Sequence, residues 1–233
     1  MELIWDGLVK AFEILINLDP EVIEVCWLTL KVSGTATLIS VLIGVPLGCL
    51  LALTRFPGRT FLVSLANFGM GLPPVVVGLW VSIFLWRSGP FGNLGIIYTP
   101  AAIVIAQAII ASPLVVSFTL AAVQQISPRL RLHLLALGAN RRQLLWSLIK
   151  EARLGLLAAV MAGFGGVISE VGASQMVGGN IKGETRVLTT ATVMEVSKGN
   201  FDIAIALSVI LLILAYGITA LLTSLQQRRS NYE

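Results

Sequence analysis

The stretch "LLALGANRRQLLWSLIKEARLG", residues 134–155, combines leucine-rich runs with a compact set of charges, in a chain where only 12% of the residues are charged. Three arginines, a lysine and a glutamate lie around a single central glycine. Apolar residues recur at helical spacing on both sides of Gly138, Ala139 and Asn140, which are residue types that end one helix and begin the next. The stretch therefore predicts two short amphipathic helices that meet at a bend.

The composition of the whole chain is that of a membrane protein. Hydrophobic residues make up 56% of its 233 residues, and the mean hydropathy is +0.90. A helix needs about 20 mostly apolar residues to cross the hydrocarbon core. We predict an all-α membrane protein, folded as a single domain over residues 1–233, with five transmembrane helices at 27–53, 61–86, 100–123, 154–177 and 203–225.

Three of the predicted spans contain internal prolines, namely Pro46, the pair Pro73 and Pro74, and Pro113. A proline removes a backbone hydrogen bond, and lipid offers no replacement partner. We expect the broken stretches to face the interior of the bundle. The first span also carries Gly44 and Gly48, a spacing that permits close helix packing.

The first 19 residues predict an amphipathic helix with two possible placements. Its apolar residues Ile4, Leu8, Phe12 and Leu15 share one face, as in a helix that lies in the membrane interface. A helix packed on the loops of the protein itself remains an equal alternative. Asp19 and Pro20 then predict the cap and the first turn of the next helix.

The distribution of basic residues predicts the orientation in the plasma membrane. With a cytoplasmic C-terminus and an external N-terminus, ten of the 16 lysines and arginines lie on the cytoplasmic side. This arrangement follows the positive-inside rule. Residues 126–153 are then the longest cytoplasmic segment, either a projection that fits a groove on a partner protein or an ordinary basic loop that contacts lipid headgroups.

The order "LGANRRQLLWSLIKEARLG" resembles the coupling loop of ABC importer permeases. That signature is a Glu-Ala-Ala triplet, three further residues, Gly-Ala, and an apolar helix that ends in Leu-Pro. Gly138 and Ala139 match the central pair and Trp146 lies in the apolar helix, whereas residues 132–134 replace the triplet and Glu151 stands at the proline position. The residues that the resemblance assigns to ATPase coupling are Leu137, Gly138, Ala139, Asn140, Arg141 and Trp146.

Residues 163–207 are similar to the oxyanion branch of the same family, which takes up molybdate, sulfate and tungstate. The segments "SEVGA", "MVGGNI", "TRVLTTA" and "KEAR" most resemble the tungstate permeases. The resemblance implies a type I ABC importer permease fold without an ATPase of its own. It also implies four kinds of partner: a second copy of the chain, two cytoplasmic ATPase subunits, an extracytoplasmic oxyanion-binding protein and membrane lipid.

Residues 178–192 are the candidates for handling an anion in the pathway or at a gate. They offer glycine N–H groups and the polar side chains of Asn180, Thr185, Arg186, Thr189 and Thr190. The alternative is a glycine-rich turn and a short helix that close the end of the bundle without touching the ion. The segment does not match the nucleotide-binding loop G-x-x-x-x-G-K-[ST], because Glu184 occupies the position of the lysine.

Glu170 is the one charge well inside a predicted span. An ionisable group at such a depth is costly and needs a partner. We expect a structural role for it, with Arg186 or a backbone N–H as the partner.

Other classes of function find little support in the sequence. Basic residues fall between apolar runs, so nucleic acid binding is not expected, and the single histidine and two cysteines predict no metal site. No cofactor and no catalytic residue is expected. The alternatives to an oxyanion importer are a secondary transporter, which would be expected to carry inverted repeats, and a membrane scaffold.

Overall fold

The structure is a computed structural model that describes residues 2–17 and 19–230. Over these residues the fold is entirely helical. No strand occurs in these residues. The helices are α1 (Glu2–Asn17), α2 (Pro20–Leu53), α3 (Arg59–Met70), α4 (Pro74–Leu85), the short 3-10 helix η1 (Gly92–Leu94), α5 (Pro100–Gln124), α6 (Pro128–Ala136), α7 (Arg141–Glu151), α8 (Arg153–Ile168), α9 (Gly172–Gly178), α10 (Leu188–Lys198) and α11 (Phe201–Ser230).

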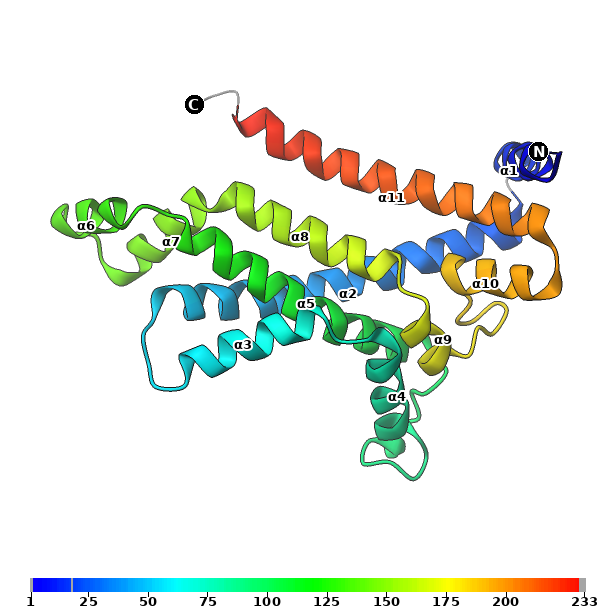
Figure 1. The fold of residues 1–233 in the computed structure, drawn as a ribbon, viewed down its shortest axis with the longest axis horizontal. Helices are drawn as coiled ribbons and strands as arrows, with labels where there is room; N and C mark the ends of the chain where they lie inside the picture. Colours follow the sequence, from blue (N-terminus) through cyan, green and yellow to red (C-terminus); the bar gives the residue numbers. More distant parts are fainter. Residues whose placement is uncertain (1, 18, 231–233) are drawn as a thin grey trace.

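The bundle is elongated, and its body consists of α2, α5 and α8, which pack against one another. Helices α6 and α7 form one end, whereas α1 and α10 lie at the other, and α4 projects sideways (Figure 1). Helix α11 runs beside the body. At the end that carries α6 and α7, it is tied to α8 by the amide of Gln226, which donates to the carbonyl of Leu154 at 3.2 Å.

Helices α2 and α5 approach closely because two glycines lie between them. A Cβ atom added at Gly44 would lie 2.7 Å from the side chain of Val115, and one at Gly48 would lie 2.7 Å from the carbonyl oxygen of Val116. Removing the side chain lets the two backbones pack directly, which is a main source of helix association in lipid. The structure shows the close packing that the spacing of these glycines permits.

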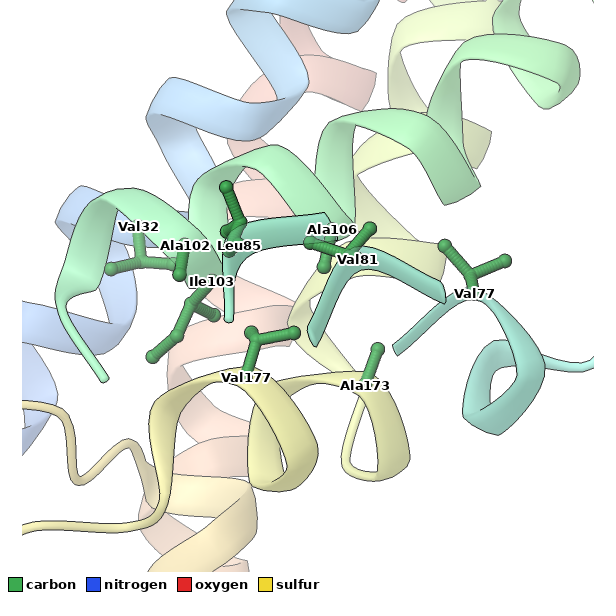
Figure 2. Packing of buried hydrophobic residues seen from close by; sticks show 9 residues of the cluster. All are labelled: Val32, Val77, Val81, Leu85, Ala102, Ile103, Ala106, Ala173 and Val177. Atoms are coloured by element: carbon green, nitrogen blue, oxygen red, sulfur yellow. The ribbon is translucent and has the colours of Figure 1, made fainter. Parts of the chain in front are cut away.

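The largest apolar cluster joins four helices near the end that carries α10 (Figure 2). Val77 and Val81 of α4 face Ala173 and Val177 of α9, and α2 and α5 complete the cluster. Gly78 permits this contact, since a Cβ there would lie 2.7 Å from Cα of Ala173. The small residues of α9 thereby hold α4 across the bundle rather than along it.

The predicted proline breaks occur at only one of the three positions. Residues 61–86 form two helices, α3 and α4, whose axes differ by 102° at Pro73 and Pro74. Pro46 and Pro113, in contrast, lie inside the continuous helices α2 and α5. On the single chain Pro46 and Pro73 are exposed, so the bundle of one chain does not cover these two positions.

The fourth predicted span, residues 154–177, is interrupted although it contains no proline. Helix α8 ends at Ile168 and α9 begins at Gly172. Helix α7 joins α8 at a bend of 66°. The described residues thus contain three continuous helices that are long and apolar enough to cross a membrane, or up to five when each bent pair counts as one span.

Helix α1 packs across α11 rather than on loops. Gly7 contacts Ile205, where an added Cβ would lie 2.5 Å away, and Ala11 is buried. The opposite side of α1 exposes five large apolar side chains: Trp5, Leu8, Val9, Phe12 and Ile16. The side chains of Ile4 and Leu15, also predicted for the apolar face, lie outside the described residues. Asp19 caps α2 as predicted, since its carboxylate accepts from the N–H of Glu21 at 2.9 Å.

Candidate functional site

The bend between α6 and α7, which we call the elbow (residues 128–151), is set by the backbone at Gly138. This residue has φ +80°, a conformation that glycine adopts without cost. Ala139 donates to the carbonyl of Leu134 and Gly138 to that of Leu135, both at 3.0 Å. This pair of bonds is the Schellman arrangement that ends a helix and turns the chain.

Asn140 begins the second helix of the elbow through a reciprocal cap. Its side-chain oxygen accepts from the N–H of Gln143, and the Gln143 side chain accepts from the N–H of Asn140, both at 2.9 Å. A capping box of this kind satisfies two backbone donors at once and fixes the first turn. Arg141 is therefore held on the first turn of α7, next to the bend, with its side chain exposed.

The elbow exposes large apolar side chains and buries others against the bundle. Leu137 is 84% exposed, Trp146 71% and Leu132 65%. Leu148 of α7 and Ala152, which follows α7, are in contrast buried. The exposed set is thus the free apolar surface of the elbow.

In residues 178–192, which we call the glycine-threonine segment, the predicted polar residues bond to one another and to the backbone. Thr185 is buried; its hydroxyl donates to the carbonyl of Gly178 at 2.6 Å and accepts from the N–H of Ile181 at 2.9 Å. These two bonds close the turn that carries Gly179 and Asn180.

Asn180 is clamped to the first turn of α10. It has φ +53°, and its side-chain oxygen accepts from the hydroxyl of Thr190 at 3.0 Å. The Thr190 hydroxyl also accepts from the N–H of Val187 at 3.2 Å. Asparagine is one of the few residues that adopt positive φ readily, because its side chain bonds locally. The segment is a rigid turn rather than an open set of donors.

Glu170 lies in the break between α8 and α9, and it is 7% exposed. Its carboxylate accepts from the N–H of Ala173 at 2.8 Å, so it caps the first turn of α9. Its own carbonyl accepts from the hydroxyl of Thr189 on α10 at 2.9 Å. Of the two expected partners, the structure places the backbone donor beside Glu170.

Arg186 points instead to α2. Its guanidinium lies 3.5 Å from the carboxylate of Glu21, which also pairs with Lys182 at 2.7 Å. The Arg186 Nε atom is buried and has no hydrogen-bond partner among the described residues. The ion pairs therefore tie the glycine-threonine segment to the start of α2.

The sequence analysis missed residues that support the break between α8 and α9. Gln107 of α5 is 2% exposed, and its amide donates to the hydroxyl of Ser174 at 3.1 Å and to the carbonyl of Val167 at 3.4 Å. Thr29 of α2 accepts from the N–H of Leu188 at 2.9 Å. A buried polar residue in an apolar helix was the available signal, but nothing local specifies its partners.

Comparison with known proteins places the chain in a family. Residues 44–231 match the family described as the inner membrane component of binding-protein-dependent transport systems. The chain belongs to this family of membrane-spanning permease subunits, and it is not an enzyme. The fold is that of type I ABC importer permeases.

Two curated relatives are similar over most of the chain. It is 38% identical to the tungstate uptake system permease protein TupB of Peptoclostridium acidaminophilum, over 97% of this chain and 100% of the relative. It is 39% identical to a probable anion ABC transporter permease protein of Haloferax volcanii, over 85% and 88% of the two chains. Among solved structures, the MetNI methionine ABC transporter in an inward-facing conformation matches with a TM-score of 0.76 and 22% identity, over 91% of this chain and 97% of that chain.

Proposed function

We propose that the chain forms the translocation pathway of an ATP-driven tungstate importer. The observation that supports this proposal is the similarity to a tungstate uptake permease along the full length of that relative, at 38% identity. The similarity to the molybdenum transport permease ModB of Escherichia coli is weaker, at 31% identity over 74% of this chain. Molybdate or sulfate transport is the second candidate. A secondary transporter finds no support, because the family depends on a binding protein.

The elbow is the docking site for a cytoplasmic ATPase in this proposal. Its exposed apolar residues, above all Leu137 and Trp146, would enter a cleft on that subunit. The Schellman turn at Gly138 and the capping box at Asn140 make the projection rigid, so that movement of the ATPase is passed to α8. Leu132 and Leu135 extend the exposed apolar surface beyond the residues assigned from sequence.

The glycine-threonine segment acts as a closing element of the pathway rather than as an ion-binding site. Thr185, Thr189, Thr190 and Asn180 already bond within the chain. Their hydrogen bonds connect α9, α10 and the α8–α9 break into one unit that would move as a gate. Weak contact with the ion also suits a pathway, since a tightly bound ion does not leave.

A second copy of the chain completes the pathway. The α3–α4 break exposes Met70, Gly71 and Pro73 on the single chain. A non-helical backbone at membrane depth is tolerated only where protein or a water-filled cavity covers it. Helix α4 also exposes large apolar residues, among them Trp80 and Phe84. A homodimer with α4 near its axis satisfies both requirements.

The orientation in this proposal has the N-terminus outside and the C-terminus in the cytoplasm. Ten of 16 basic residues then lie inside, and the elbow faces the ATPase. The apolar face of α1, with Trp5 and Phe12 exposed, would rest in the outer membrane interface. A reporter fused after Glu233 should be active only in the cytoplasm, and activity only outside would reverse the orientation.

The substrate is tested by ATP hydrolysis of the reconstituted permease with its ATPase and its binding protein, titrated separately with tungstate, molybdate and sulfate. We expect tungstate to stimulate hydrolysis at a far lower concentration than the other two anions. Equal stimulation by all three anions would mean that the transporter accepts oxyanions broadly and is not specific for tungstate. No stimulation by any anion, with the complex intact, would overturn the oxyanion assignment.

A further inference from the structure

A cavity of about 690 Å³ opens where α7 meets α8, on the side of α2. Val41 and Val45 of α2 form one wall, and Leu157 and Val160 of α8 form another. Trp146, Lys150 and Arg153 line the end nearest the elbow. The cavity is therefore apolar at one end and basic at the other.

The basic and the apolar residues that α8 contributes to the cavity lie at different heights along the helix axis. Val160 lies seven residues beyond Arg153 on α8, a rise of about 10 Å along the helix axis. The apolar walls thus extend about 10 Å into the region of the membrane-spanning helices, starting from the two cations.

The charge of the cavity selects the class of lipid. Among the described residues that line it, two are basic and none is acidic. Basic pockets between membrane helices on the cytoplasmic side are suited to anionic headgroups, and the cytoplasmic leaflet is rich in anionic lipids. This step rests on the orientation proposed above.

A second groove on the same bundle provides the contrast. It has a volume of about 600 Å³ and is lined by α2, α3 and α5, including Leu65 and Pro113. No charged residue is among its described lining residues, and its Ser112 hydroxyl donates to the carbonyl of Ala108 at 2.6 Å. That groove has the apolar walls but lacks the cations.

We propose that the cavity between α2, α7 and α8 binds one anionic phospholipid, with the phosphate at Lys150 and Arg153 and an acyl chain along Val45 and Val160. A lipid in this position would contact both the elbow and the span that the elbow moves. Lipid composition would then influence the transfer of motion from the ATPase to the pathway.

The test is native mass spectrometry of the intact permease–ATPase complex, purified from bilayers with equal amounts of phosphatidylglycerol and phosphatidylcholine and then mildly delipidated. We expect one retained phosphatidylglycerol per permease chain, in preference to phosphatidylcholine. The Lys150→Gln/Arg153→Gln variant should lose that preference, because a cation near the membrane surface contributes roughly fivefold to the affinity for an anionic lipid and the variant removes both basic residues of the cavity.

The matched charge control is Arg129→Gln/Arg131→Gln, which removes two cations from α6 outside the cavity and should leave retention unchanged. For the apolar walls, Val160→Trp should displace the lipid, whereas Leu65→Trp in the uncharged groove should not. Equal phosphatidylglycerol retention by the two double variants would overturn the proposal. Displacement of the lipid by millimolar inorganic phosphate would also overturn it, since the site would then recognise a free anion without an acyl chain.

Discussion

Thr189 on α10 donates its hydroxyl to the backbone carbonyl of Glu170, 2.9 Å away in the break between α8 and α9. The bond connects the glycine-threonine segment to a residue whose side chain caps α9 through the N–H of Ala173. One hydroxyl thus links the end of α8, the start of α9 and the start of α10. Disturbing it should loosen this end of the bundle.

We expect Thr189→Val to destabilise the protein by about 1–3 kcal/mol, because it leaves a buried carbonyl without its partner while preserving the side-chain shape. Unfolding in mixed micelles with increasing denaturing detergent measures the change. Thr192→Val is the matched control, since the one bond of the Thr192 hydroxyl among the described residues is to Leu188 in its own helix, and its loss should cost no more than about 0.5 kcal/mol. Equal effects of the two variants would contradict the linking role of Thr189.

Charge reversal should distinguish the partners of Arg186. We expect Arg186→Glu to fail to rescue Glu170→Arg, because Glu170 bonds to the backbone and Arg186 lies beside Glu21. Glu21→Arg combined with Arg186→Glu should instead recover part of the transport lost in either single variant. Transport of tungstate into vesicles measures both pairs, and rescue of Glu170→Arg would show that the carboxylate pairs with Arg186.

The effect of substituting Glu170 on stability should depend on whether the new side chain can accept a hydrogen bond. Glu170→Gln retains a side-chain oxygen for the N–H of Ala173 and should stay close to the parent protein in stability. Glu170→Leu removes the cap and should cost about 0.5–2 kcal/mol, the usual range for a lost helix cap. The same detergent titration decides between them, and equal losses for both variants would mean that the charge, rather than the cap, matters.

The backbone at Gly138 should control coupling in the proposed transporter. No atom lies within 4 Å of a Cβ added there, so substitution acts through φ +80° alone. Gly138→Val should cost roughly 1–2 kcal/mol in that conformation and reduce substrate-stimulated ATP hydrolysis, with insertion intact. Gly138→Asn should retain most of the stimulation, because asparagine tolerates positive φ. Unchanged stimulation of ATP hydrolysis in the valine variant would show that coupling does not depend on the turn at Gly138.

Because α2 packs closely on α5 at Gly48, the protein should be far more sensitive to substitution of Gly48 than of Gly34. Gly48→Ala places a Cβ 2.7 Å from the Val116 carbonyl and should destabilise the bundle by about 1–3 kcal/mol. Gly34→Ala in the same helix meets no atom within 4 Å and should stabilise it by up to about 1 kcal/mol, the helix-propensity difference. Opposite signs in a thermal unfolding assay are the expected result.

Stability should fall in acid partly through Glu195 of α10. The side-chain hydrogen bonds from Lys198 and Asn200 hold the pKa of this carboxyl below its ordinary value of 4.5. Because the folded pKa is the lower one, the contribution is complete above pH 4.5 and is lost as the pH falls through the folded pKa. The difference in midpoint temperature between the parent and Glu195→Gln should therefore shrink below pH 4.5, and a difference that grew in acid would contradict this sign.

Several local features could be predicted from the sequence because they depend on neighbours in the chain. Asp19 and Pro20 begin α2, Gly138 and Asn140 turn the elbow, and the spacing of Gly44 and Gly48 indicates a close contact. Each is a short-range signal in which the residue type and its spacing are sufficient. The all-helical class follows in the same way from apolar runs long enough to cross a membrane.

Only the tertiary structure decided how these parts meet. Pro46 and Pro113 continue their helices, yet the chain turns by 102° at Pro73 and Pro74 and breaks without a proline before Gly172. The sequence by itself determined the all-helical class and several of the residues that cap or turn the helices. Packing between distant segments determined that Arg186 meets Glu21 and that Thr189 meets Glu170, because a hydrogen bond or an ion pair depends on atoms brought within a few ångströms by the whole fold.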